Sequence, residues 1–547
     1  MQRNSQLEKL KTENFDICII GAGASGAGVA LDAILRGYSV AMIEKVDFSS
    51  ETSSKSTKLI HGGVRYLEQA FKKLEPSSLK QVKHGLAERQ YLLANAPHLA
   101  KPLGIITPVF SWIEGLYYTI GLKLYGLFAK NDHLPKAEWL SKSETLRLAP
   151  SLNPKINSGV IYYDGQLDDA RYVMALVQAA HAKGTVVANY VEAQSFVKNE
   201  AGKLTELLVK DTVNNQSFAI KSKVFINCTG PFSDHIRLMA NPAEETRIKP
   251  AKGVHIMLPK EFFDSEKAML IPKTKDGRLV FVIPFKSEVM VGTTDTPYKN
   301  LEKEPLLIKE EVNFLLETLT PFLRKMPTED DIKSGFGGVR PLLSAKTNNQ
   351  NETKGLLRDH EVEIDEASGL ISLLGGKWTT YRLMAEDTVN KVGAILKNNK
   401  ESSTHFHKLW GAQNQQLNKE SFLKSNSNIE TETLEHLWST YGDQATEVLK
   451  IAASDKALGE KIIEGYPYLK AEVTYGSRYE MVEKPRDYLA RRIRVEILDW
   501  NLTKTMTPTV AQLIGTELEW TSEKIEKEKN EYESLIEGFI SAKNKFE

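Results

Sequence analysis

Apolar and polar residues follow one another through the first 45 positions in a pattern that predicts a strand, a helix and a second strand. An apolar run at residues 17–20 predicts the first strand, helical spacing follows to Arg36, and residues 39–43 predict the returning strand. Three glycines with the spacing GxGxxG stand where the first strand gives way to the helix: Gly21, Gly23 and Gly26. The pattern indicates a βαβ unit of the kind that binds a dinucleotide.

The glycines and one acidic residue indicate what this unit holds. Gly21 permits a tight turn, Gly23 lets the backbone approach a pyrophosphate, and Gly26 lets helix and strand pack closely, while the helix N-terminus attracts phosphate charge. Glu44 ends the second strand and is placed to accept hydrogen bonds from adenosine ribose hydroxyls. An acid at this point argues against the 2′-phosphate of NADP. The segment by itself leaves both FAD and NAD open.

The chain then alternates between loops and regular elements. Residues 49–69 are rich in small hydroxyl residues and contain a glycine pair, which predicts a loop able to line a phosphate and an isoalloxazine ring. Residues 79–93 have helical spacing, and residues 168–187 predict a helix, a glycine stop and a strand. Residues 224–234 predict a strand that returns to the nucleotide-binding domain and turns under the cofactor.

Short alternating runs in the following region predict an antiparallel sheet rather than further βαβ units. These runs are GVHIMLP, RLVFVIPF and EVMVGTTD, between residues 253 and 295. The chain therefore leaves its nucleotide-binding domain and enters it again. Residues 369–392 repeat the order of strand, double glycine and helix, and the N-terminus of that helix could face the far end of the same cofactor.

The C-terminal part predicts a separate helical domain after a polar linker at residues 397–415. Residues 486–500 have helical spacing, with Arg491, Arg492 and Arg494 on a basic face that we interpret as a solvated or salt-bridged surface. Residues 522–546 alternate lysine and glutamate and predict an exposed amphipathic helix.

Composition limits the class of protein. The 547 residues are 41% hydrophobic and 26% charged, which is typical of a globular protein of two to four domains. Equal numbers of basic and acidic residues, 71 each, leave no net charge to drive nucleic-acid binding. The two cysteines, Cys18 and Cys228, lie in apolar runs, form no zinc site by themselves and indicate a reduced, cytosol-facing protein. We expect no metal.

Residues 109–129 are the one membrane-like segment. They are long enough to span a bilayer, but Glu114, Lys123 and several glycines argue against a spanning helix. We favour a buried or partly buried helix of a substrate domain, and the alternative is a surface that enters a lipid interface through its aromatic residues. The residues before Phe15 lack the apolar core of a secretory signal, so we expect a cytoplasmic protein.

Several motifs, in one order along the chain, give the sequence a family resemblance. They are TSSKSTKLIHGGVRYLE at residues 52–68, GVRPL at 338–342, LLRDHE at 356–361, GGKWTTYR at 375–382 and RYEMVEKPRDYLARRIR at 478–494. With these motifs the chain resembles the FAD-dependent respiratory glycerol-3-phosphate dehydrogenases over nearly its whole length.

The resemblance implies an α/β protein. It implies a glutathione-reductase-like FAD-binding Rossmann domain, a substrate domain on an antiparallel sheet (α+β) and a C-terminal all-α domain. We expect the FAD-binding domain at residues 1–75, 160–245 and 336–397, the substrate domain at 76–159 and 246–335, and the helical domain at 412–547.

The implied reaction is oxidation of sn-glycerol 3-phosphate to dihydroxyacetone phosphate, with hydride passing from carbon 2 to flavin N5 and electrons going on to a membrane quinone. One alternative is an oxidase that uses oxygen and releases hydrogen peroxide, although we find no spare segment for the insertion that such relatives typically carry. A second alternative is a flavin-carrying protein that binds a phosphorylated metabolite or a partner without turning it over.

The resemblance assigns roles to residues at matching positions. Arg340 and Arg358 are the candidates for the substrate phosphate, because a guanidinium meets phosphate oxygens in a two-pronged fork, and Arg65 and Tyr66 complete that pocket. His255 is the candidate general base, because imidazole titrates near neutral pH.

Two further positions are open to interpretation. His61 competes with His255 for the role of base, although its neighbouring glycines suggest a backbone contact with the flavin. Lys377 could place an ammonium near the flavin ring and favour its anionic reduced form. Trp378 stands where relatives can carry a smaller aliphatic residue, which leaves the local shape of the flavin pocket open.

We expect FAD to be bound without a covalent link, because no histidine or cysteine stands in the usual place for attachment. The expected cofactor-binding residues are Gly21, Gly23, Ala24, Ser25, Gly26, Glu44, Lys45, Thr52, Ser53, Ser56, Lys58, His61, Gly62, Gly63, Val191, Thr229, Gly230, Gly376, Lys377, Trp378 and Thr379.

The expected partners are glycerol 3-phosphate, a membrane quinone and a lipid surface, with no nucleic acid and a possible homodimer. Quinone use implies peripheral association with the inner face of the cytoplasmic membrane. The segment at residues 109–129 and the basic face near Arg491 are both candidate contact surfaces.

Overall fold

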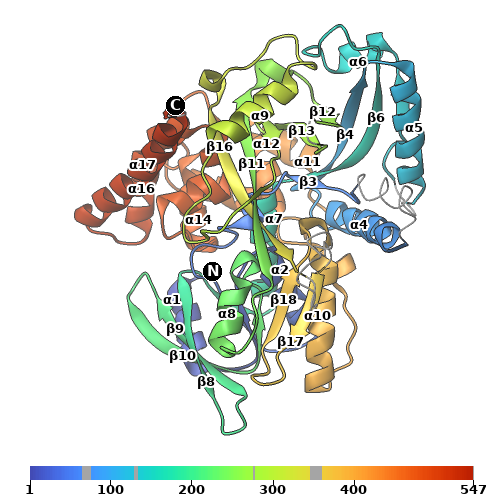
Figure 1. The fold of residues 1–547 in the computed structure, drawn as a ribbon. Coiled ribbons are helices and arrows are strands. Elements are labelled where there is room, and N and C mark those ends of the chain that lie inside the picture. Colours follow the sequence, from blue (N-terminus) through green and yellow to red (C-terminus); the bar gives the residue numbers. More distant parts are fainter. Residues whose placement is uncertain (64–75, 129–132, 275–276, 345–359, 546–547) are drawn as a thin grey trace.

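A computed structural model describes residues 1–63, 76–128, 133–274, 277–344 and 360–545 (Figure 1). In this part of the chain two sheets meet end to end, with the first in the lower half of Figure 1 and the second in the upper half, and helices of the C-terminal part lie against one side. The predicted α/β architecture, with an antiparallel second sheet and a helical C-terminal domain, is confirmed.

The first sheet is mainly parallel at its centre. Its eight described strands are β1 (Asn14–Ile20), β2 (Val40–Ile43), β7 (Val186–Ala188), β8 (Val191–Lys198), β9 (Leu204–Asp211), β10 (Gln216–Asn227), β17 (His360–Ile364) and β18 (Ile371–Gly375). They run in the order β17-β18-β10-β1-β2-β7, and β9 and β8 extend the sheet antiparallel beside β10. Strand β1 lies between its parallel neighbours β2 and β10, with α2 leading from β1 to β2, and a crevice at the carboxyl end of such a central strand is a usual ligand site.

Strand β1 shows why this sheet has a core on each face. Successive side chains of a strand point to opposite faces. Ile17 and Ile19 accordingly join the core under α2 (Ala24–Leu35), α7 (Asp169–Ala182) and α10 (Tyr381–Leu396), whereas Cys18 and Ile20 join the core under α1 (Arg3–Thr12) and α8 (Ser233–Ala240). Both cysteines are buried, Cys228 in the first of these cores and Cys18 in the second.

The second sheet is antiparallel except where β12 pairs with β4. Its ten described strands are β3 (Leu59–Ile60), β4 (Ala100–Val109), β5 (Glu138–Leu140), β6 (Ser158–Leu167), β11 (Ile248–Pro259), β12 (Ala268–Ile271), β13 (Val280–Phe285), β14 (Glu288–Gly292), β15 (Thr296–Pro297) and β16 (Ser334–Leu343). The helices of this half are α4 (Pro76–Asn95), α5 (Trp112–Leu127), α6 (Lys142–Leu148) and α9 (Lys309–Leu319).

The C-terminal part is helical, as predicted. Its described helices are α11 (Lys419–Ser425), α12 (Thr431–Tyr441), α13 (Ala445–Ser454), α14 (Lys470–Tyr479), α15 (Val495–Leu498), α16 (Trp500–Glu517) and α17 (Ser522–Asn544). Val254, Ile256 and Leu258 of β11 share one core with side chains of α14 and α16, so this domain covers one face of the second sheet. The other residues of β11, including His255, therefore face away from it.

Two sheet pairings favour shifting two of the expected domain boundaries. Strand β6 crosses the expected boundary at residue 160 and pairs with β4, and β16 crosses the one at 336 and pairs with β11. Both strands belong wholly to the second sheet. We propose that the FAD-binding domain resumes after each of them.

The basic face expected near Arg491 is not a surface. Residues 486–500 form a π-helical turn, η8 (Asp487–Arg492), followed by α15, with Arg494 in the left-handed region at φ 73° between them. Arg491, Arg492 and Arg494 are 5%, 1% and 1% exposed, so both the solvated-surface interpretation and the idea of a lipid contact there are wrong.

Buried carboxylates hold these arginines. Arg491 Nε and Arg492 Nη1 lie 2.6 and 2.9 Å from the same Asp47 oxygen. Burial raises the pKa of the Asp47 carboxyl, but Arg492 and Arg491 outweigh burial and the net pKa is lowered. Asp47 belongs to the loop that follows β2, so the C-terminal domain is tied by charge to the first sheet.

We expect Asp47→Asn to lower the free energy of unfolding by about 3–5 kcal/mol, because it leaves two buried guanidinium groups without this counter-charge. Urea denaturation of the holoprotein measures it. A matched control is Asp16→Asn, whose partner Lys223 is 69% exposed and which should cost below about 1 kcal/mol. Equal losses in the two variants would contradict the importance of the buried network.

Candidate active site

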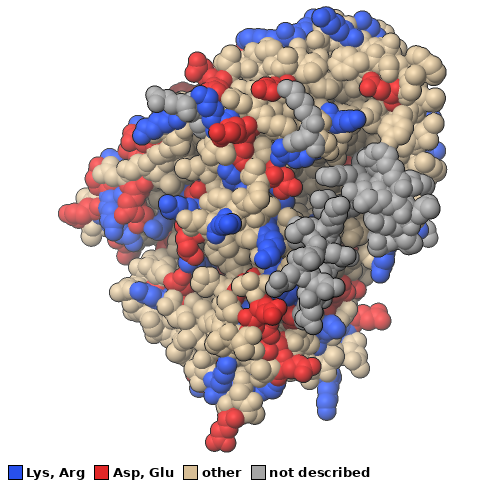
Figure 2. Space-filling view, in the orientation of Figure 1, with Lys and Arg blue, Asp and Glu red and all other residues tan. Residues whose placement is uncertain are grey.

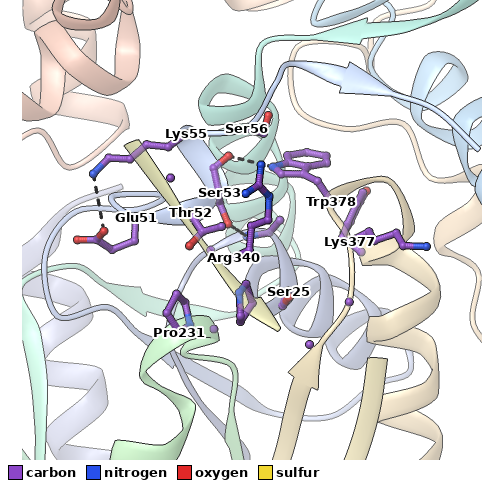
Figure 3. A pocket seen from close by; sticks show the side chains of 18 of the residues that line it. Ser25, Glu51, Thr52, Ser53, Lys55, Ser56, Pro231, Arg340, Lys377 and Trp378 are labelled. Atoms are coloured by element: carbon purple, nitrogen blue, oxygen red, sulfur yellow. Dashed lines mark hydrogen bonds and ion pairs between the residues drawn. The ribbon is translucent and has the colours of Figure 1, made fainter. Parts of the chain in front are cut away.

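A cavity of about 860 Å³ lies at the carboxyl ends of β1, β2 and β10, between the two sheets. Such a volume lies toward the upper end for small-molecule and cofactor sites. Its walls come mainly from five segments far apart in the sequence: residues 20–25, 43–63, 228–239, 278–295 and 373–384. Further residues come from α4, β8, β11, β16 and positions 301–302. In Figure 3, Arg340 is drawn between Ser53 above it and Ser25 and Pro231 below it.

The glycine turn has the predicted geometry. Gly21 has φ +99°, and a Cβ there would lie 2.8 Å from the carbonyl oxygen of Cys228. Gly23 is the N-cap residue of α2, and a Cβ on it would lie 2.7 Å from Ser53 Oγ, which accepts a hydrogen bond from the Ala24 amide. Gly26 does not line the cavity; a Cβ on it would collide with Gly21, which fits its expected packing role. The N-terminus of α2 is thereby left open for a phosphate.

Glu44 is held by the backbone at the cavity wall. Its carboxylate accepts hydrogen bonds from the Ala22 amide at 2.8 Å and the Val46 amide at 3.2 Å. Burial is the largest influence and raises the pKa of Glu44 to about 6, although the two amides act against it. The side chain is thus a preoriented acceptor that is ionised above about pH 6, which suits ribose hydroxyls. Beside it, Lys45 forms an ion pair with Glu192 at 2.9 Å.

The loop after β2 is anchored to the turn after β18 and to β16. Trp378 Nε1 donates to the Ser53 carbonyl at 2.9 Å (Figure 3), and Thr52 Oγ1 donates to the Val339 carbonyl at 2.6 Å. Ser56 lines the cavity but donates through its amide and hydroxyl to Asp169. The indole of Trp378 therefore shapes the cavity by holding the loop.

Lys58, expected to contact the cofactor, is turned away from the cavity. Its Nζ donates at 2.6 Å to both the Ser54 carbonyl and Asp169 Oδ2, and its side chain is fully buried outside the lining. Burial lowers the pKa of Lys58 to about 8, against the opposing effect of Asp169. Lys58 fixes the loop from behind, a role that its spacing in the sequence did not reveal.

His255 and Arg340 lie side by side on the wall formed by the second sheet. The His255 ring stacks on Phe336 with centroids 4.9 Å apart, and its Nε2 lies 3.0 Å from Thr57 Oγ1. Arg340 Nη2 donates to Thr293 Oγ1 at 3.1 Å, and Nη1 lies 3.1 Å from Asp295 Oδ1. The His255 ring packs against Gly292, the residue before Thr293, which brings imidazole and guanidinium together.

The protonation state of His255 differs from the simple expectation. Burial, and then the positive charges of Lys58 and Arg340, lower the pKa of His255 well below its usual 6.5. The imidazole is therefore neutral at neutral pH. The pKa of His61 is likewise lowered, to about 4, by burial and by Lys377 and Arg89.

Lys377 enters the cavity wall from the turn after β18, with Nζ 3.2 Å from Gln81 Oε1 of α4. Figure 3 draws its side chain to the right of the cavity centre, away from Arg340. It therefore lies on the side of α4 and the His61–Gly63 turn rather than beside the candidate phosphate site.

Most expected cofactor-binding residues meet at this cavity, but not all can be placed. Arg65, Tyr66 and Arg358 fall outside the described residues. The expected residues that line the cavity are Gly21, Gly23, Ala24, Ser25, Glu44, Lys45, Thr52, Ser53, Ser56, His61, Gly62, Gly63, Val191, Thr229, Gly230, His255, Arg340, Gly376, Lys377, Trp378 and Thr379.

Sequence reasoning missed other polar residues that line the cavity, among them Thr57, Gln81, Arg278 and Asp295. Thr57 belongs to a quoted motif and could have been selected as a hydroxyl beside the flavin-side loop. Gln81, Arg278 and Asp295 carry no local signal, because only the pairing of β11 with β14 and the packing of α4 bring them to the site.

A βαβ turn with Gly23 at the helix N-terminus, an acid at the end of β2 and a cavity that a second sheet closes are typical of a flavin-dependent oxidoreductase. A family model described as FAD dependent oxidoreductase matches residues 16–382, and one described as the C-terminal domain of alpha-glycerophosphate oxidase matches residues 402–525.

Relatives narrow this class to one family. The chain is 37% identical over 561 residues to the probable mitochondrial glycerol-3-phosphate dehydrogenase of Dictyostelium discoideum, covering 98% of this chain and 86% of the relative. It is 39% identical to the mitochondrial glycerol-3-phosphate dehydrogenase of Homo sapiens, covering 95% and 72%.

A solved structure agrees with these relatives. The glycerol-3-phosphate dehydrogenase of Bacillus halodurans, complexed with FAD, matches with a TM-score of 0.80 and 28% identity over 98% of this chain and 97% of that one. The chain belongs to the family of FAD-dependent glycerol-3-phosphate dehydrogenases, and its cofactor is FAD.

We expect the affinity for FAD to fall as the pH is lowered through about 6, because a protonated Glu44 loses the charge that favours the ribose hydroxyl donors. Titration of the apoprotein with FAD between pH 5 and 8, followed by flavin fluorescence, measures this. Glu44→Gln should weaken FAD binding roughly tenfold or more and flatten the profile. The exposed Glu200→Gln is the matched control, and a native profile that is flat across this range would contradict the role of Glu44.

Proposed function

We propose that the protein oxidises sn-glycerol 3-phosphate to dihydroxyacetone phosphate and passes the electrons to a membrane quinone. The observation that carries this proposal is the pairing of the Arg340 guanidinium with the neutral His255 imidazole on one wall of the FAD cavity. A small substrate with a phosphate at one end and a secondary hydroxyl near it suits that pairing. Family membership supports the same substrate.

Arg340 would hold the phosphate. Its guanidinium presents a planar set of donors that stays charged at any working pH, and Thr293 supports one edge of it. The Asp295 carboxylate at 3.1 Å would be displaced or screened when a phosphate dianion arrives. This exchange favours a doubly charged phosphate over weaker anions.

His255 would take the hydroxyl proton. Because its pKa is depressed, the ring is neutral before substrate binds, and the negative phosphate at Arg340 would offset part of the positive charge that depresses it. Thr57 at 3.0 Å from Nε2 holds the ring orientation and can exchange a proton with it. Stacking on Phe336 and contact with Gly292 leave the imidazole little freedom to turn.

Two electrons leave carbon 2 with the hydride, and the hydroxyl proton leaves separately to His255, so the alcohol becomes a ketone. When bound, FAD supplies the hydride acceptor. Lys377 would contribute positive charge on the far side of the cavity, where negative charge develops during this transfer. Arg340 would orient the substrate, and residues of the loop from Ser49 to Thr57 line the same cavity.

Helix α5 supplies the surface for a lipid partner. Its described side chains include Trp112 at 64%, Ile113 at 63%, Tyr117 at 52% and Ile120 at 52% exposed. No described helix has the length and apolar character needed to cross a bilayer. In Figure 2 the upper right edge, where α5 lies in Figure 1, is mostly uncharged. The exposure favours the alternative interpretation of residues 109–129, a helix lying in a lipid interface.

We expect anaerobic glycerol 3-phosphate to bleach the flavin absorbance of the holoenzyme, and a short-chain quinone analogue to restore it. The measurement is stopped-flow absorbance at the flavin maximum, with peroxide assayed in air. Fast stoichiometric peroxide with no effect of the quinone would instead assign oxygen as the acceptor. A flavin that stays oxidised with saturating substrate would contradict the proposed reaction altogether.

We expect Arg340→Ala to raise the Michaelis constant for glycerol 3-phosphate at least about a hundredfold while FAD stays bound, because a charge-assisted phosphate contact is lost. Steady-state kinetics with a soluble dye as acceptor measure the constant, and flavin absorbance measures occupancy. The exposed Arg147→Ala is the matched control. An unchanged Michaelis constant would remove Arg340 from the phosphate site.

We expect the double variant Ile113→Asp and Ile120→Asp to weaken binding of the holoenzyme to phosphatidylcholine–phosphatidylglycerol vesicles at least about tenfold, since two apolar side chains can no longer leave water. Flotation with vesicles measures this. The control replaces Val197 and Leu208, which are 37% and 39% exposed on the β8–β9 hairpin, with aspartate. Equal vesicle binding by both double variants would show that α5 is not the lipid surface.

A further inference from the structure

The inner face of helix α5 touches the flavin-side turn directly. Tyr125 is 2% exposed, and its hydroxyl accepts a hydrogen bond of 2.7 Å from the amide of Gly62. Gly62 lies between His61 and Gly63, and all three line the FAD cavity. One hydrogen bond therefore joins a helix of the second sheet's outer layer to the backbone at the cofactor.

The Tyr125 hydroxyl is held in one orientation. It donates to the Asp164 carboxylate, 3.1 and 3.2 Å from the two oxygens, and Asp164 is in turn paired with the fully buried Arg89 of α4. The phenol thus donates a hydrogen bond to Asp164 and accepts one from the Gly62 amide. Burial and Asp164 raise the pKa of Tyr125 well above its usual value, so the hydroxyl keeps its proton.

The His61–Gly63 turn is closely packed against α4. A Cβ on Gly62 would lie 2.7 Å from Leu86 Cγ, and a Cβ on Gly85 would lie 2.8 Å from Gly62 Cα. The His61 amide is held by Thr379 Oγ1 at 3.3 Å, in the turn after β18. A displacement of Tyr125 must therefore be taken up by the Gly62 peptide, which faces the cavity on its other side.

The two faces of α5 have different partners. Trp112, Ile113, Tyr117 and Ile120 face outward, whereas the buried residues Gly115, Thr119, Leu122 and Tyr125 follow helical spacing on the inner face. Gly115 sits against the indole of Trp139, where a Cβ would lie 2.5 Å from the ring. A force that acts on the outer face and displaces α5 would therefore also displace Tyr125, because both belong to one helix.

We propose that Tyr125 is a positioning residue for the flavin. The hydroxyl of Tyr125 fixes the Gly62 amide and makes the geometry of the cofactor site depend on the position of α5. The residue acts through the backbone of the turn and touches no reacting atom. Substrate binding is unaffected, because Arg340 and His255 stand on the other wall. The proposal rests on FAD occupying this cavity and not on the lipid or quinone assignment.

The first test removes the hydroxyl alone. Tyr125→Phe leaves the Gly62 amide and Asp164 without their shared partner, and should raise the FAD dissociation constant roughly tenfold. The visible spectrum and the midpoint potential of bound flavin should shift, while the Michaelis constant for glycerol 3-phosphate stays as in the native holoenzyme. Unchanged affinity, spectrum and potential would overturn the proposal.

The second test moves α5 without touching the turn. Gly115→Ala forces α5 and Trp139 apart, and Gly121→Ala on the same helix is the matched control because nothing lies within 4 Å of a Cβ there. Gly115→Ala should change the flavin spectrum and FAD affinity, and Gly121→Ala should not. Combined with Tyr125→Phe, Gly115→Ala should have no further effect on the flavin, because the hydrogen bond between Tyr125 and Gly62 is already absent.

The outcomes separate clearly. Additive effects of Gly115→Ala and Tyr125→Phe, or no effect of Gly115→Ala on the flavin, would overturn the coupling through α5. If Tyr125→Phe does not fold, Gly115→Ala against Gly121→Ala decides alone. The assays use no lipid and no quinone, and FAD titration needs no turnover. A failure of the proposed reaction would therefore leave the result on Tyr125 intact.

Discussion

Two buried carboxylates, Asp47 and Asp169, hold the loop between β2 and β3, and the FAD site depends on that loop. Asp169 accepts from the amide and hydroxyl of Ser56, from Lys58 Nζ at 2.6 Å and from Arg494 Nη2 at 3.0 Å. The loop has little regular structure of its own, so its backbone groups need partners elsewhere. Charges buried in this way stabilise the fold only while every partner is present. Arginines of the C-terminal domain therefore supply part of the counter-charge for the carboxylates that hold this loop.

This constraint explains which parts of the molecule could be predicted from the sequence. The close contact of Gly26 with Gly21 and the hydrogen bonds of Glu44 with Ala22 and Val46 join residues that are near in sequence, so the spacing was sufficient to predict this turn. Arg491, Arg492 and Arg494 were predicted to lie on a solvated or salt-bridged surface, and the structure shows the salt bridges but not the surface. Helical spacing identifies residues that share a face, but it does not say what covers that face, and here Asp47 and Asp169 meet it from more than 300 residues away. Long-range charge pairing decided the outcome.

Helix α5 shows the opposite error of sequence-based prediction: its segment was expected to be buried or partly buried, and one face is exposed. Its apolar composition favoured burial, yet the second sheet already has a complete core against β4 and β6 and needs only Leu122, Tyr125 and their neighbours on the inner face. The apolar side chains of Trp112, Ile113 and Ile120 on the outer face stay more than half exposed. Hydropathy alone could not separate a buried helix from a helix with an exposed apolar face, because both use the same residue types. The position of α5 at the edge of the molecule distinguishes them (Figure 1).

The loop anchors also set the electrostatics of the proposed chemistry. Lys58 is fixed behind the loop by Asp169, with its ammonium 4.9 Å from the centroid of the Phe336 ring on which His255 stacks. Its charge is one cause of the depressed pKa of His255, and Arg340 is another. A base held neutral by nearby cations gains basicity when an anionic substrate neutralises one of them. In the proposed reaction, proton transfer to His255 would thereby be coupled to phosphate binding at Arg340, and the ion pair that holds Lys58 behind the loop would contribute to this coupling.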